Sequence, residues 1–123
     1  MKKCLVIDDS LVNRLATEAL VEELGFTPVG FDNAKDALHV LEKENDFDVM
    51  LVDWHMPEIN GIEFLKRMRK TSEGRNTVIF IYSSLEGLEG MPEALRAEAD
   101  GFIYKPVSKE KLIEYFKITR LIG

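Results

Sequence analysis

Residues 49–61 read VMLVDWHMPEING, and this stretch decides how the rest of the chain is interpreted. It starts with four apolar residues, Val49 to Val52, and then reaches Asp53, which precedes the one tryptophan of the chain. A continuous apolar run of this length is typical of a central strand that is buried on both faces. A carboxylate at the end of such a strand is costly to bury without partners, so other parts of the sequence have to supply them.

Four further segments have the length and composition of strands. CLVI (Cys4 to Ile7) and VIFIY (78–82) are continuous apolar runs and are predicted to be central strands. TPVGF (27–31) contains a proline and a glycine, which fit poorly in a central ladder, so we expect an edge strand. GFIY (101–104) is short and is predicted to form the other edge.

Amphipathic segments separate the apolar runs. Apolar residues at helical spacing predict helices over residues 11–24, 34–41 and 61–70, and a last helix, capped by Ser108, that runs to about Ile122. A further helix is predicted to begin near Pro92, because proline is favoured in a first helical turn. This alternation predicts an α/β fold: a doubly wound, five-stranded parallel sheet with five helices. In such sheets ligands bind beyond the carboxyl ends of the strands.

Composition limits the class of protein. The 123 residues fit one domain, 1–123, and no apolar run approaches the roughly 20 residues that span a bilayer, so we expect no membrane insertion. The start of the chain lacks a signal-peptide core, and one cysteine cannot form an internal disulfide; both favour the cytoplasm. Cys4 is interpreted as a small buried hydrophobe, with a reactive thiol as the alternative. The net charge of −6 argues against direct binding of nucleic acid.

Polar side chains follow four of the predicted strands, and the carboxyl ends of parallel strands share one rim of a sheet. These side chains are Asp8, Asp9, Asp53, Ser83 and Lys105. Two like charges about 4 Å apart repel by about 4 kcal/mol at an effective dielectric constant near 20. Each residue alone has a plain structural explanation, such as a cap or a solvated charge. Together, three carboxylates and one lysine favour a divalent cation bound through oxygen, and Mg²⁺ fits best.

With this constellation, the chain resembles the receiver domain of two-component response regulators, the chemotaxis-type phosphoacceptors. The residues that carry the resemblance are Asp8-Asp9, the stretch DWHMPEING that begins with Asp53, Ser83, and Lys105-Pro106. The resemblance covers the whole chain, in the order and spacing of all elements. It implies a flavodoxin-like fold with the strand order 2-1-3-4-5, for which this family is a known example. It also implies a stand-alone response regulator.

The resemblance assigns a role to each residue at the rim. Asp53 would be the nucleophile that takes a phosphoryl group from a phosphohistidine of a histidine kinase or phosphotransfer protein. Mg²⁺ would be bound by Asp8, Asp9, Asp53 and the backbone carbonyl of His55. Lys105 would pair with the phosphoryl group. An imidazole ligand from His55 is the less favoured alternative, because magnesium prefers oxygen.

Two further residues would form the switch. Ser83 would move to bond a phosphoryl oxygen, and Phe102 would follow it inward. The family often has threonine and tyrosine at these positions, so Ser83 keeps the hydroxyl while Phe102 lacks one. Leu85 and His55 border the phosphoryl group in receivers, and we expect them to tune the lifetime of the acyl phosphate by controlling access of water.

The last predicted helix could provide an output surface, to which a target protein would bind. Tyr115, Ile118 and Ile122 lie beside its core-facing stripe, which favours either deeper packing or a docking surface shared with the last strand and the fourth helix. Because the chain ends at Gly123, we expect output by binding a downstream target protein, as a monomer or a phosphorylation-dependent dimer. We expect no enzymatic activity beyond its own phosphorylation and dephosphorylation.

Three other classes of protein could place an aspartate at the end of such a strand. A haloacid-dehalogenase-type phosphatase needs a second acid two residues after the nucleophile, where this chain has His55. A nucleotide- or flavin-binding protein would have a glycine-rich loop after the first strand, where this chain reads DDSLVNR. A receiver-fold docking module that acts without phosphorylation has no such conflict and remains the alternative.

Overall fold

The computed structural model describes residues 2–56, 58–71, 75–83 and 98–123. Five strands are β1 (Lys3–Ile7), β2 (Thr27–Phe31), β3 (Val49–Asp53), β4 (Val78–Ser83) and β5 (Gly101–Tyr104). The described helices are α1 (Leu11–Glu23), α2 (Ala34–Lys43), α3 (Gly61–Arg69) and α5 (Lys109–Ile118). The helix predicted near Pro92 lies outside the described residues, as does Leu85.

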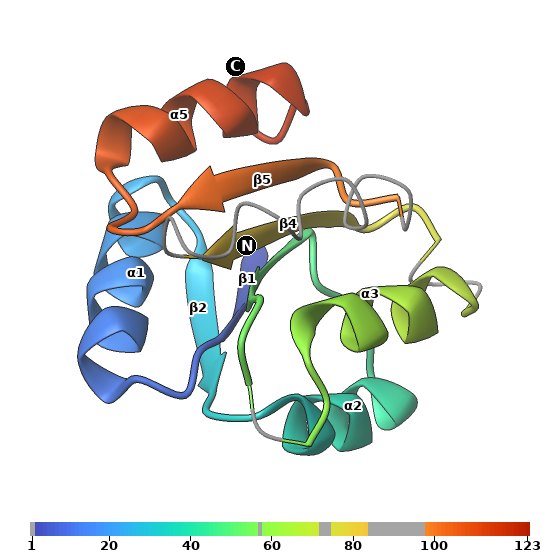
Figure 1. Cartoon of the computed structure of the whole chain (residues 1–123). Coiled ribbons are helices and arrows are strands. Elements are labelled where there is room, and N and C mark those ends of the chain that lie inside the picture. Colours follow the sequence, from blue (N-terminus) through green and yellow to red (C-terminus); the bar gives the residue numbers. More distant parts are fainter. Residues whose placement is uncertain (1, 57, 72–74, 84–97) are drawn as a thin grey trace.

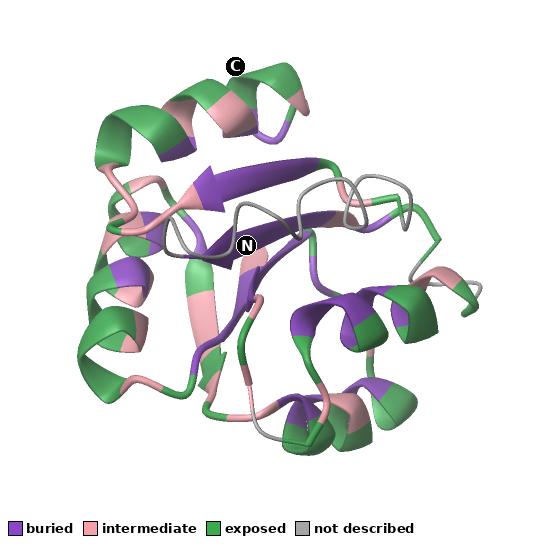
Figure 2. Cartoon of the chain, viewed as in Figure 1, coloured by how far each residue is buried: buried purple, intermediate pink, exposed green. Residues whose placement is uncertain are grey.

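All strands pair in parallel, in the order β2-β1-β3-β4-β5 (Figure 1). The expected α/β fold and strand order are therefore confirmed. The strand that contains a proline and a glycine is at one edge, and the short last strand is at the other. Every residue of the central strand β3 is buried, and Figure 2 shows buried residues along most of the neighbouring strand β4. A continuous apolar run is needed there because both faces of a parallel sheet are covered.

Helices cover the two faces of the sheet in pairs, α1 and α5 on one side and α2 and α3 on the other (Figure 1). Alternate residues of β3 serve the two layers: Val49 and Leu51 pack with the α1 and α5 side chains, while Met50 and Val52 pack with those of α2 and α3. Cys4 is fully buried in the first of these layers, and burial raises the pKa of its thiol. This environment matches its interpretation as a small hydrophobe.

Each described helix begins at a polar capping residue. The side-chain oxygens of Ser10, Asn33, Asn60 and Ser108 each accept the backbone N–H three residues further on. Such a cap stabilises a helix by about 1 kcal/mol, because it bonds an otherwise unpaired N–H. None of the described helices has the length and apolar character needed to cross a membrane.

The last helix is shorter than predicted. It ends at Ile118 rather than near Ile122. The Thr119 hydroxyl donates to the carbonyl of Tyr115, and Arg120 adopts a left-handed conformation with φ 62°. The turn allows Leu121 to bond back to the helix and become buried. Burial of that one leucine ends the helix, which helical periodicity alone does not reveal.

Candidate functional site

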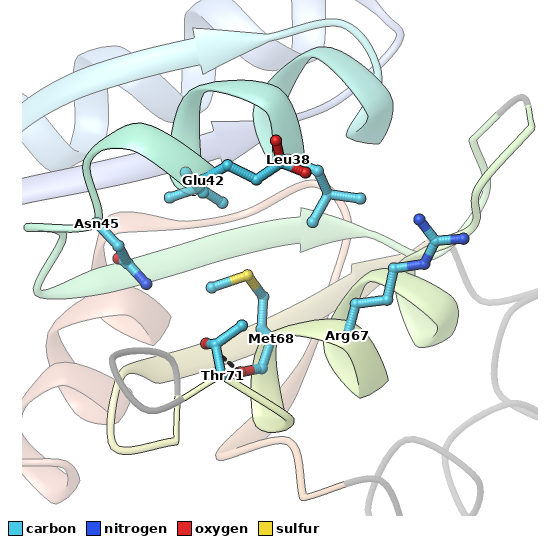
Figure 3. Close-up of a pocket in the computed structure, with 7 residues that line it drawn as sticks. Leu38, Glu42, Asn45, Arg67, Met68 and Thr71 are labelled. Carbon is cyan, nitrogen blue, oxygen red and sulfur yellow. Dashed lines mark hydrogen bonds between the residues drawn. The ribbon is translucent and has the colours of Figure 1, made fainter.

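A cavity of about 290 Å³ lies between α2 and α3 (Figure 3). Leu38 and Glu42 line it from α2, and Met68 lines it from α3. The hydroxyl of Thr71 also faces it and donates to the carbonyl of Met68 at 2.8 Å. None of the acids or hydroxyls predicted to carry chemistry lines this cavity. The candidate site is therefore the rim at the carboxyl ends of the strands.

At that rim the ends of β1 and β3 bring two buried carboxylates to one lysine. The Nζ atom of Lys105, which follows β5, lies 3.1 Å from Oδ2 of Asp53 and 3.3 Å from Oδ2 of Asp8. Asp8 is 0% exposed and Asp53 is 3% exposed. Buried charges require partners, and the lysine offsets part of the negative charge.

Asp8, Asp9 and Asp53 form a cluster of carboxylate oxygens. One oxygen from each lies within 4.8 Å of the others, and Asp9 is the exposed member. Hard oxygen ligands of this kind suit Mg²⁺, so the donor set fits the predicted ion. His55 is exposed beside them, and its backbone N–H donates to Oδ1 of Asp53 at 3.3 Å.

The surroundings of Asp53 oppose its charge. Burial raises the pKa of Asp53 from 3.8 to about 6, and the nearby charge of Asp8 adds to the increase. Lys105 and the N–H of His55 lower this pKa but do not cancel the effect of burial. A buried carboxylate with this environment gains from an approaching cation.

The two residues predicted to form a switch, Ser83 and Phe102, are both buried. Ser83 is 1% exposed, and its Oγ has no hydrogen-bond partner within the described part of the chain. Its carbonyl accepts the N–H of Lys105 at 2.7 Å, which holds it beside the lysine. Phe102 is 6% exposed, and its ring centroid lies 6.5 Å from that of the half-buried Trp54.

Sequence reasoning missed two residues of the site. A Cβ atom on Gly61 would lie 2.6 Å from the backbone oxygen of Asp53, so only glycine fits this close approach. The hydroxyl of Tyr82 donates to Oδ2 of Asp8 at 2.8 Å. A signal for the tyrosine was present, because a hydroxyl within an apolar strand needs a partner. The contact of Gly61 left no comparable signal.

The comparisons with known proteins agree with this geometry. The sequence matches the response regulator receiver domain family over residues 4–117. The chain belongs to that family, whose members are signalling components of two-component systems and work with histidine kinases and downstream targets. The resemblance seen in the sequence is thereby confirmed.

Several relatives are similar over most of the chain. It is 33% identical to chemotaxis protein CheY-3 of Vibrio cholerae, over 94% of this chain and 92% of that protein. It is also 33% identical to the chemotaxis protein CheY homolog of Campylobacter jejuni, over 98% and 92%. Sensory/regulatory protein RpfC of Xanthomonas campestris is 34% identical over 91% of this chain, which is 16% of that longer protein.

Solved structures show the same fold. The chemotaxis response regulator CheY4 of Vibrio cholerae has a TM-score of 0.85 at 27% identity, covering 97% of this chain and 98% of that one. The receiver domain of the Francisella response regulator 1452 has a TM-score of 0.82 at 33% identity, covering 97% and 96%. The receiver domain of histidine kinase PA1611 from Pseudomonas aeruginosa shares the fold at 22% identity, with a TM-score of 0.85 over 97% and 98%, and contains a magnesium ion in its active site cleft.

Proposed function

We propose that this chain is a single-domain response regulator, residues 1–123, that is phosphorylated on Asp53 in a Mg²⁺-dependent reaction. The donor is the phosphohistidine of a histidine kinase or phosphotransfer protein. The observation that carries the proposal is the position of the buried Asp53 carboxylate, 3.1 Å from Nζ of Lys105 and clustered with Asp8 and Asp9. Family membership and the chemotaxis relatives support the same role.

The proposed reaction is a phosphoryl transfer between two side chains. A carboxylate oxygen of Asp53 attacks phosphorus, and the bond between phosphorus and the histidine nitrogen breaks. The electron pair leaves with the imidazole, which takes a proton from solvent, and Asp53 becomes an acyl phosphate. Asp8, Asp9, Asp53 and the carbonyl of His55 would hold Mg²⁺, which would supply charge neutralisation for the phosphoryl oxygens. Lys105 contacts a phosphoryl oxygen as a point charge.

The hydroxyl of Ser83, which has no hydrogen-bond partner among the described residues, supports the proposed switch. A buried hydroxyl without a partner is costly, and a phosphoryl oxygen on Asp53 gives it an acceptor. Phe102 follows this movement and changes the face formed by β5, α5 and the predicted fourth helix. The hydroxyl of Tyr115 on α5 donates to the carbonyl of Phe102 at 3.0 Å, so the strand and the helix are connected. Ile118 is 69% exposed on this face, which suits docking of a target protein.

A second exposed apolar surface lies on α1, next to the acidic residues of the site in the sequence. The helix α1 begins two residues after Asp9, and three of its apolar side chains are more than half exposed: Leu11, Val12 and Leu15. Exposed apolar side chains that gather on one helix are typical of protein contacts. We assign this surface to the phosphodonor, whose histidine has to reach Asp53.

The lifetime of the acyl phosphate is assigned to the residues that border it. His55 is exposed beside Asp53, where its side chain controls the approach of water. Leu85 has the same proposed role and lies outside the described residues. Exchanging the side chain at either position changes the rate of dephosphorylation, which is measured as loss of the phosphorylated mass with time.

The test of the proposal is a comparison of intact masses. The protein is incubated with Mg²⁺ and a small phosphodonor, and the unmodified chain gains one phosphoryl group. Asp53→Asn and removal of the metal with EDTA both abolish the gain, whereas Asp48→Asn, which replaces an exposed acid just before β3, retains it. The absence of a mass gain with every donor and with the cognate kinase contradicts the proposal.

The alternative is a docking module that acts without phosphorylation. One observation favours it: Phe102 is already buried against Trp54, so the switch aromatic does not need phosphate to turn inward. The two functions differ in partner binding. Asp53→Asn weakens binding of the target under phosphorylating conditions if phosphate is the signal, and equal binding supports the docking module.

A further inference from the structure

Tyr82 lies beside Asp53 on the neighbouring strand and one residue before Ser83. Its side chain is 1% exposed and packs on the face of the sheet that α1 and α5 cover. A hydroxyl buried in such a layer is costly unless it forms a hydrogen bond. One partner of this hydroxyl is the carboxylate of Asp8, a residue of the candidate cation site, and the side chain of Thr17 on α1 is a second.

The carboxylate of Asp8 is held from several directions. Its Oδ2 accepts the hydroxyl of Tyr82 at 2.8 Å, and Nζ of Lys105 lies 3.3 Å from the same atom. Its Oδ1 accepts the backbone N–H of Ser10 at 2.9 Å. The guanidinium of Arg14 donates to the backbone carbonyl of Asp8, also at 2.9 Å. The orientation of this carboxylate is therefore set by the protein itself.

The donors on Oδ2 differ in how well they fix direction. Lys105 is a point charge on a flexible stem, and it is shared with Asp53. The ring of Tyr82 is packed in the core, so its hydroxyl approaches Asp8 from one direction. A phenol hydroxyl keeps its proton at neutral pH, so the hydroxyl of Tyr82 is a donor to Asp8.

We infer that Tyr82 is a positioning residue of the cation site: its hydroxyl holds the Asp8 carboxylate toward Asp9 and Asp53 and so raises the affinity for Mg²⁺. The inference rests on the proposed function, because it requires that this cluster binds Mg²⁺. Hydrogen bonds to metal-ligating carboxylates typically change metal affinity by ten- to hundredfold. Tyr82 thus belongs to the site without touching the phosphoryl group.

The test compares two tyrosine-to-phenylalanine variants in the unphosphorylated protein. Tyr82→Phe keeps the ring and removes the donor to Asp8. Tyr115→Phe is the matched control, because its hydroxyl donates at 3.0 Å to the backbone carbonyl of Phe102 and not to an acid. Mg²⁺ affinity is measured by titration calorimetry and by the fluorescence of Trp54, the one tryptophan. Thermal unfolding in EDTA reports the structural effect separately.

Tyr82→Phe is expected to weaken Mg²⁺ binding about tenfold, while Tyr115→Phe leaves it unchanged. In an Asp8→Asn background, Tyr82→Phe is expected to have no additional effect on affinity, since the hydroxyl acts through Asp8. If Tyr82→Phe lowers the unfolding temperature but binds Mg²⁺ as tightly as the unmodified chain, the inference is overturned and the hydroxyl is structural only. Failure of the unmodified chain to bind Mg²⁺ contradicts the proposed function first and this inference with it.

A second measurement needs no variant and covers the case in which Tyr82→Phe does not fold. In protein labelled with ¹³C at the tyrosine ring carbon that bears the oxygen, addition of Mg²⁺ is expected to shift the signal of Tyr82 and to leave that of Tyr115 in place. A Tyr82 signal that does not move when Mg²⁺ saturates the site overturns the inference.

Discussion

Lysine and aspartate meet at both ends of the sheet, in different surroundings. Where the strands begin, Nζ of Lys3 lies 2.8 Å from Oδ1 of Asp46, and both side chains are in contact with water. The hydrogen bond from Lys3 lowers the pKa of Asp46. Where the strands end, Lys105 lies 3.1 Å from Asp53, yet burial raises the pKa of Asp53 to about 6.

The two lysine–aspartate distances are similar. The opposite pKa shifts of the two carboxyl groups therefore come from the difference in their desolvation. An exposed ion pair keeps its hydration, so the attraction between the two opposite charges stabilises the ionised form of each side chain. A buried carboxylate loses hydration that one shared lysine does not replace. The ends of the strands therefore carry negative charge at a cost in stability, and this condition favours the binding of a cation.

Replacing the lysine at each end is the strongest way to test this comparison. Lys105→Met leaves Asp8 and Asp53 buried without their cation, so the metal-free protein is expected to lose about 3 kcal/mol of stability. The rate of phosphorylation is expected to fall about hundredfold, because a charge that contacts the phosphoryl group is lost. Denaturant unfolding in EDTA and the time course of the phosphorylated mass measure these effects.

Lys3→Met is the matched control for that variant. It removes an exposed partner of Asp46, so stability and phosphorylation are expected to stay close to those of the unmodified chain. Equal effects of the two replacements would show that burial does not distinguish the ends of the sheet.

The close approach of Gly61 to β3 gives the next largest effect. Gly61→Ala places a Cβ 2.6 Å from the backbone oxygen of Asp53, so the strand end or the start of α3 has to move. We expect a loss of about 2 kcal/mol in stability and slower phosphorylation. Gly123→Ala adds its Cβ in open space and is expected to change neither quantity. An unaltered phosphorylation rate in Gly61→Ala would show that this contact does not position the nucleophile.

The charge of Asp53 itself predicts a pH dependence of stability. Its pKa in the folded protein, about 6, is above the ordinary 3.8, so the folded state binds the proton more tightly. The stability from this group is present at low pH and is lost as the pH rises through about 6. Asp53→Asn does not ionise, so it is expected to be more stable than the unmodified chain in EDTA by about 2 kcal/mol at neutral pH.

Chemical denaturation at several pH values measures that difference. It is expected to shrink as the pH falls from about 7.5 to about 4.5, where the carboxyl of Asp53 is protonated. Asp48→Asn, at the exposed residue that precedes β3, is expected to show no such trend. A stability difference for Asp53→Asn that is independent of pH would mean that burial does not oppose the charge of Asp53.

Much of the fold was predictable because each strand can be recognised from the composition of its own segment. The apolar runs located the central strands, and Pro28 and Gly30 placed β2 at an edge. The acids and the lysine of the site were found because the ends of parallel strands share one rim. The end of α5 was predicted wrongly because it depends on burial of Leu121, which is a tertiary effect.

The remaining site residues depend on contacts between elements. In the sequence, Tyr82 is an ordinary strand residue. Only the order of the strands in the sheet shows that its hydroxyl contacts Asp8. In the sequence, Gly61 is only the first residue of a predicted helix. Its close contact with the end of β3 follows from the packing of α3. Neither contact follows from sequence spacing, because each joins segments whose separation in space is set by the whole fold.

The most direct test of the central claim is to identify the phosphorylated residue. The protein is phosphorylated in Mg²⁺ and treated with borohydride, which reduces an acyl phosphate of aspartate to homoserine, and its peptides are sequenced by mass spectrometry. We predict homoserine at position 53 and unmodified aspartate at positions 46 and 48, at the opposite end of the sheet. Conversion at another acid, with Asp53 intact, would contradict the account.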